Sequence, residues 1–212
     1  MEESYISALD DFICARYSDY VKISALEGYK MPEVITVAKD GNIVRRDSSV
    51  MRLELQPERD ALLKKFKDGL ADTNYTFSFA FIPFRDRVRD RFSKYTFAKV
   101  LPDVLAHYGE TGESVGEKLA IEPRFWRKIV KGKLYPEKGT VLALALVCRM
   151  QRGDVDKLLN VCGYSFAEDN VRDLVVEYLL SQSIFNPEMR DRCLAEYHIT
   201  NLPIKRNNDE NL

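Results

Sequence analysis

The pattern of hydrophobic and polar positions changes along the chain, from mixed helical and alternating runs to helical spacing throughout. Apolar residues at helical spacing predict one or two amphipathic helices over residues 4–29. Two short β-type runs flank Asp40-Gly41 and predict a hairpin over residues 34–46. Aromatic side chains at every second position predict a strand over residues 75–81. We therefore expect an α+β N-terminal domain with a small, mostly antiparallel sheet covered by helices.

From residue 97 onward the apolar spacing predicts a compact all-α bundle of about seven helices joined by short connections. The run from 140 to 150 is apolar on all sides, which predicts a helix buried within the bundle. Asn170 is placed to cap the next long helix, and Pro187 to open the last one. We expect the polar end of the chain, residues 204–212, to fray.

These patterns divide the chain into an α+β domain, a charged linking helix, a helical domain and a polar tail, at residues 1–84, 85–95, 96–204 and 205–212. The linking helix carries acidic and basic side chains at pairing distance, as a solvated helix face does. Its remaining arginines, Arg85, Arg87 and Arg91, could also extend a surface that contacts phosphates.

Residues 115–137, VGEKLAIEPRFWRKIVKGKLYPE, predict a short helix, a tight turn and a second, basic helix. Pro123 suits the first turn of the second helix, because its fixed φ is helical and no N–H is needed there. Gly132 supplies the stop, and Ser114 with Glu117 forms a capping-box pattern for the first helix. The second helix has an apolar and a basic side: Phe125, Trp126, Ile129 and Val130 against Arg124, Arg127, Lys128 and Lys131.

This stretch resembles the Cro/repressor-type (XRE-like) helix-turn-helix and aligns with that pattern without a gap. Val115 and Gly116 take the places of a Leu-Ala pair, Ala120 and Ile121 the turn, Trp126 and Ile129 the apolar positions of the second helix, and Gly132 and Pro136 the terminal pair. Ala120 replaces the usual glycine and Trp126 is larger than the usual isoleucine. Over residues 97–203 the chain also resembles the helical module at the C-terminus of various bacterial macrodomain and stress- or defence-associated proteins. The N-terminal half carries no such resemblance.

The resemblance implies a non-enzymatic DNA-binding protein, a bacterial transcriptional regulator that inserts the second helix into the major groove of double-stranded DNA. It puts Arg124 and Lys128 at base-reading positions, where arginine suits guanine. The expected DNA-binding set is Pro123, Arg124, Arg127, Lys128, Lys131 and Lys133, in which the last two lysines and Arg127 neutralise phosphates. A homodimer is expected, because one motif covers only a few base pairs. The first domain would supply the dimer contact or sense a ligand.

The charge distribution leaves an alternative open. The net charge is −1, yet residues 85–138 hold 13 basic against 8 acidic side chains, with acidic excess on both flanks. A basic excess over a whole domain is the usual sign of a nucleic-acid binder. The alternative is therefore a protein-interaction or scaffold module of a bacterial stress or phage-defence system, with a helix-turn-helix shape and no DNA contact.

The sequence offers little for catalysis. It has no Walker-type loop, GxSxG, HExxH or Cys/His pair, so we expect no enzyme, cofactor or metal. Asp40, Asp47 and Glu54 could suggest a nuclease-like metal site, but turn and strand-edge carboxylates explain them more simply. The aromatic stripe at 75–81 is explained by a packed sheet face better than by base stacking, since no basic residue interleaves with it. The four spaced cysteines are expected to be buried free thiols rather than disulfides or zinc ligands.

The expected compartment is the cytoplasm. No apolar run reaches the roughly 18 to 20 residues needed to cross a bilayer, and the first residues are acidic where a signal peptide would be basic. We therefore expect no membrane association.

Overall fold

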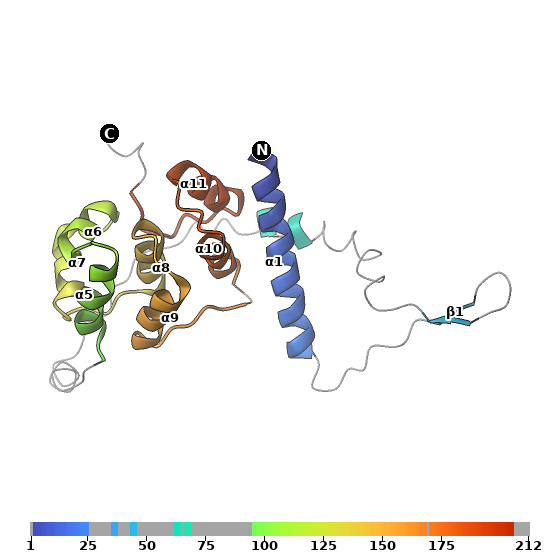
Figure 1. The fold of residues 1–212 in the computed structure, drawn as a ribbon, viewed down its shortest axis with the longest axis horizontal. Coiled ribbons are helices and arrows are strands. Elements are labelled where there is room, and N and C mark those ends of the chain that lie inside the picture. The colour runs from blue at the N-terminus through green and yellow to red at the C-terminus, as the bar shows by residue number, and fades with distance from the viewer. Residues whose placement is uncertain are drawn as a thin grey trace. The chain divides into compact units, whose positions relative to one another are not determined.

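The structure, a computed structural model, describes residues 2–25, 35–37, 43–45, 62–64, 66–68, 95–168 and 170–205 (Figure 1). The chain divides into two compact units, Met1–Leu70 and Ala71–Leu212. None of the described helices is both long enough and apolar enough to cross a membrane.

The first unit is built on one long helix, α1 (Glu2–Ala25). Its Leu9 and Ile13 side chains are fully buried. The ring of Tyr17 meets the edge of Phe66 with centroids 4.9 Å apart, and Lys67 donates to Asp10 at 3.0 Å. The short helical pieces at residues 62–64 and 66–68 therefore pack along α1. Two strands, β1 (Ile35–Val37) and β2 (Ile43–Arg45), pair antiparallel, with Thr36 opposite Val44.

The expected α+β domain is wrong, because the described residues of the first unit are mainly helical. The two strands have three residues each, and no third strand joins them among those residues. A lone two-stranded hairpin buries too little apolar surface to form a sheet domain. The aromatic stripe at 75–81 and the linking helix at 85–94 lie outside the described residues, as do Asp40, Asp47 and Glu54.

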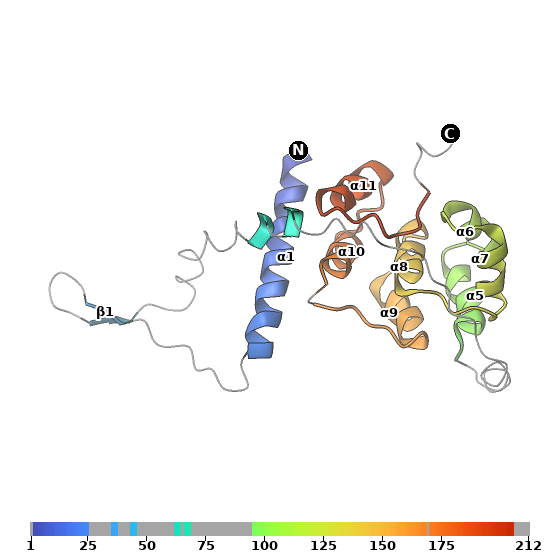
Figure 2. The same cartoon turned by 180° about the vertical axis from the view of Figure 1, so that it is seen from behind.

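The described residues of the second unit form seven helices: α5 (Phe97–His107), α6 (Gly112–Lys118), α7 (Pro123–Val130), α8 (Lys138–Val147), α9 (Arg152–Val161), α10 (Val171–Ser181) and α11 (Pro187–Glu196). Within this unit, α5, α6 and α7 lie at one end, α8 and α9 lie in the middle, and α10 and α11 lie at the other end (Figures 1 and 2). Short loops join these helices, as in other helical bundles.

Helix α8 forms the centre of the bundle. All of its residues from 139 to 146 are buried, and it packs against α6, α9 and α10. A helix that is apolar on every side has no polar face to expose to solvent, so other helices must cover it on all sides. The all-apolar run noted in the sequence is therefore confirmed as a buried helix.

Six helices of the bundle end in the same kind of turn, with one residue in the left-handed conformation. At Gly132 the amide bonds to Ile129 O at 2.9 Å and the next amide bonds to Lys128 O at 2.8 Å, which is the Schellman pattern. Gly109 and Gly163 repeat it, but Arg149, Ser183 and His198 adopt it without being glycine, with φ of 55°, 53° and 52°. Left-handed backbone costs an L-residue roughly 1–2 kcal/mol.

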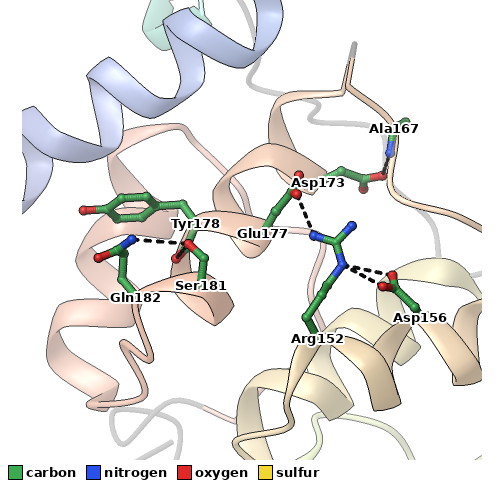
Figure 3. Close-up of polar contacts among 8 residues, drawn as sticks. All are labelled: Arg152, Asp156, Ala167, Asp173, Glu177, Tyr178, Ser181 and Gln182. Carbon is green, nitrogen blue, oxygen red and sulfur yellow. Dashed lines mark hydrogen bonds and ion pairs between the residues drawn. The ribbon is translucent and has the colours of Figure 1, made fainter.

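Polar contacts tie α9 and α8 to α10. Arg152 on α9 pairs with Asp156 at 2.9 Å and with Glu177 of α10 at 2.6 Å, and Figure 3 shows its guanidinium between the two carboxylates. Asp173 of α10 is fully buried and accepts from Lys138 on α8 and from the amide of Ala167 at 2.9 Å. A buried carboxylate is tolerated because these partners satisfy its oxygens.

Candidate nucleic-acid interface

Trp126 docks α7 onto α6. Helix α7 starts with Pro123 at its first position and buries Trp126 and Ile129. The indole Nε1 donates to Gly112 O at 2.5 Å. The ring lies directly against Gly116, where an added Cβ would come within 2.5 Å of the indole Cδ1. Glycine at position 116 is therefore what makes room for the large residue at position 126.

The first helix of the motif begins earlier than its sequence suggests. Its N-cap is Thr111, which accepts from the amide of Ser114 at 3.1 Å, while the Thr111 amide donates to Ser114 Oγ at 2.9 Å. The prediction that Ser114 is the cap is therefore wrong. Ser114 is the third residue of the helix, because a hydroxyl three positions earlier takes the capping role.

A small polar cluster secures that end of α6. Glu110 accepts from Ser114 Oγ at 2.6 Å and from the ammonium group of Lys118. These hydrogen bonds, first that of Lys118 and then that of Ser114, hold the pKa of Glu110 below its ordinary value. The cluster therefore keeps the Glu110 carboxylate ionised and joined to both ends of α6.

The C-terminal segment fastens the turn between α6 and α7. Leu119 forms an antiparallel bridge with Ile204, the amide of Ala120 donates to Pro203 O at 3.0 Å, and the amide of Lys205 donates to Lys118 O at 3.1 Å. The prediction that the chain frays from residue 204 is wrong for these two residues, because Ile204 is buried and backbone bonds hold both. Residues 206–212 lie outside the described part.

The predicted DNA-binding residues lie on the side of α7 and its C-terminal turn that faces away from Trp126 and Ile129. We name five of them the basic face: Arg124, Arg127, Lys128, Lys131 and Lys133. Lys128 is half-buried; Pro123 and the other four residues are exposed. The turn at Gly132 places one lysine on each side of it, which extends the basic face beyond the last turn of α7.

Contacts within the basic face set its charge. Arg124 pairs with Glu122 at 2.5 Å, and Arg124 and Lys128 both lie over the ring of Phe125, at 4.9 and 5.6 Å from its centroid. Among the described residues, no carboxylate pairs with Arg127, Lys131 or Lys133. The charges of Arg127, Lys131 and Lys133 are thus uncompensated among these residues. Arg124, the fourth exposed cation, has a surface ion pair with Glu122, and such pairs contribute little free energy.

No protein-family model, curated protein or solved structure matches the chain. The resemblance to the XRE-like motif therefore stays a prediction.

Two features were outside the reach of sequence reasoning. The size of Trp126 was recognisable, but nothing along the chain shows that Gly116 lies beneath its ring. The bridge between Leu119 and Ile204 joins residues far apart in sequence, and a lone Ile-Lys pair near a polar end gives no strand signal. A glycine in the middle of a short amphipathic helix was the one available hint, because it weakens the helix unless a close contact requires it.

The described residues hold no group of three or more His, Cys, Asp or Glu side chains able to bind a metal. All four cysteines are free, and Cys14, Cys148 and Cys193 are buried. Burial raises the pKa of Cys148 and of Cys162 to about 12. Both thiols are thus protonated at neutral pH and poor nucleophiles.

The raised pKa values predict that these two thiols react slowly with a disulfide reagent. At pH 8 we expect Cys148 and Cys162 of the native protein to react with a soluble disulfide reagent roughly a hundredfold more slowly than after unfolding, because only thiolate reacts. The rate would be followed by absorbance with and without guanidinium chloride, and mass spectrometry would identify the labelled cysteines. Rapid labelling of Cys148 in the native protein would contradict its buried placement.

Proposed function

We propose that the protein is a non-enzymatic DNA-binding protein, a bacterial transcriptional regulator that places α7 in the major groove. The observation that carries the proposal is the basic face, in which Arg127, Lys131 and Lys133 have no carboxylate partner among the described residues. At 1.5 Å per residue α7 is about 12 Å long, and the major groove admits a helix of this kind.

The division of roles follows from position along α7. Arg124 is at the N-terminal end, which approaches base edges most closely in helix-turn-helix complexes. Its surface pair with Glu122 can be exchanged for the O6 and N7 atoms of guanine, an acceptor pair that matches a guanidinium. Arg127, Lys131 and Lys133 would neutralise phosphates and fix the register of the helix on the duplex. A homodimer would read two half-sites.

The test is the salt dependence of binding to random duplex DNA. Measured by fluorescence anisotropy between about 50 and 200 mM salt, wild-type affinity should fall steeply, because each phosphate contact releases counterions. The double variant Arg127→Ala/Lys131→Ala should lower the slope of log K against log salt by about 2, one for each lost contact.

The matched control is Lys64→Ala/Lys157→Ala, which removes the same charge from two exposed lysines off the basic face. It should leave the slope unchanged. If both double variants weaken DNA binding equally, the loss comes from the change in net charge of the protein. The basic face is then not the DNA interface. If the wild type shows no affinity at low salt, the DNA-binding proposal fails altogether.

The second candidate is a protein-interaction or scaffold module of a stress or defence system. It is favoured by exposed carboxylates on α6, Glu113 and Glu117, which lie in the half of the motif that would otherwise face phosphates. A surface with both charges fits a protein partner better than a polyanion. Absence of DNA binding with preserved folding would favour it.

A further inference from the structure

A groove of about 800 Å³ lies beside the helix-turn-helix turn of the second unit. Its lining comes from α6 with the turn before it, the C-terminal end of α8, the N-terminal part of α11 with the loop before it, and the C-terminal segment. Small-molecule sites range from about 300 to 1,000 Å³, so the groove has room for a molecule of nucleotide size. These four segments are far apart in sequence, and only folding brings them together.

The lining is rich in cations. Lys118, Arg149, Arg190 and Lys205 line the groove, against the two carboxylates of Glu110 and Glu117. Glu110 pairs with Lys118, and Asp191 pairs with Arg190. The lining charges without a partner among the described residues are therefore Arg149 and Lys205 against Glu117. The excess of positive charge favours an anionic occupant.

Arg190 makes the groove more than a charged surface. The residue is 5% exposed, and its Nε and Nη2 contact Asp191 at 2.7 Å. A guanidinium has five N–H donors, and those on Nη1 have no partner among the described residues. A buried arginine with unused donors at the wall of a groove is suited to holding an oxyanion in two hydrogen bonds.

Arg149 is a second arginine suited to binding an oxyanion in the groove. It is exposed and sits in the left-handed conformation at the end of α8, where glycine would carry no strain. No ion pair or hydrogen bond of its side chain to the described residues offsets that cost. Ser183 and His198 occupy equivalent backbone positions at other helix ends, so they provide controls for the conformation alone.

We propose that the groove binds a phosphorylated small molecule of nucleotide size, with its phosphate between Arg149 and Arg190 and near Lys205. The half-buried ring of Phe185 also lines the groove and offers a surface for a base or another flat ring. Charge-assisted hydrogen bonds from arginine to phosphate are among the stronger polar contacts in proteins.

The site also touches the motif itself. Lys118 and Lys205 line the groove and are joined through their backbones at 3.1 Å. A ligand that engages both side chains would hold the C-terminal segment against the turn between α6 and α7. This coupling to DNA rests on the proposed function, whereas binding to the groove does not. By linkage, DNA and ligand would change each other's affinity by the same factor.

The experiment is calorimetry on the full chain with AMP, adenosine, ribose 5-phosphate and inorganic phosphate as probes, in the absence of DNA. AMP should bind more tightly than phosphate alone, and adenosine should bind weakly or not at all. Arg149→Gly should weaken AMP binding by about tenfold or more, because one charge-assisted contact is lost. Its Tm should be unchanged or higher, because glycine relaxes the backbone.

His198→Gly is the matched control, since it makes the same backbone change at a residue that does not line the groove, and it should leave AMP binding unchanged. Lys205→Ala should also weaken AMP while its backbone bond stays in place. Absence of binding by every probe overturns the proposal, and so does AMP binding that Arg149→Gly leaves intact. Because no DNA is present, a failure here is separate from a failure of the DNA interface.

Discussion

Asp173→Ala is expected to lower the free energy of unfolding by about 3–5 kcal/mol, because it leaves a partly buried ammonium without its counter-charge. The side chain of Asp173 is 0% exposed and that of Lys138 is 17% exposed. The substitution also removes the acceptor of the Ala167 amide. Urea denaturation followed by circular dichroism would measure the loss, with an unchanged m-value showing that the same cooperative unit unfolds.

Asp156→Ala is the control for that prediction. Asp156 pairs with Arg152 one helical turn away, and both side chains are 42% exposed. Pairs of this kind contribute about 0–1 kcal/mol, so the loss should be several times smaller than at Asp173. Equal losses of unfolding free energy in the two variants would show that the buried pair between α8 and α10 stabilises the protein no more than a surface pair does.

Sequence reasoning placed the second helix of the motif well because its limits are local. Pro123 at the first position and Gly132 after the last turn each act within a few residues of themselves. The burial of α8 followed from a run with no polar side. In both cases neighbouring residues determine the outcome, whatever the rest of the chain does.

The sequence predictions were wrong where the structure depends on contacts between residues far apart in the chain. Short β-type runs beside Asp40-Gly41 predict a hairpin but do not say whether other strands will join it, and none does among the described residues. In the same way, nothing along the chain indicates that Asp173 of α10 pairs with Lys138 of α8, because the two residues are far apart in sequence. The cations of the groove come from four segments, so no spacing along the chain could indicate them.

Gly116→Ala is expected to lower the free energy of unfolding by about 1–3 kcal/mol, although alanine is the better helix former. The new methyl group would lie 2.5 Å from the indole of Trp126, too close for any real contact, and the ring is held by its hydrogen bond to Gly112 O. The ring must therefore move, and α7 must move with it. Thermal and urea unfolding would both report the loss.

Gly153→Ala supplies the control with the opposite sign. Gly153 lies in α9 with nothing within 4 Å of its missing Cβ, so alanine should stabilise the protein by about 0.5–1 kcal/mol. If Gly116→Ala is also neutral or stabilising, the close contact with Trp126 is wrong.

The double variant Gly116→Ala/Trp126→Ile tests whether the two residues act as a pair. Isoleucine removes the ring that the alanine methyl would strike, so the double variant should be more stable than the sum of the two single changes predicts. If the angle between α6 and α7 depends on this fit, Gly116→Ala should also weaken duplex binding in conditions where the protein remains folded, although it removes no charge. Unchanged DNA affinity in that variant would show that the basic face tolerates movement of the helix that carries it.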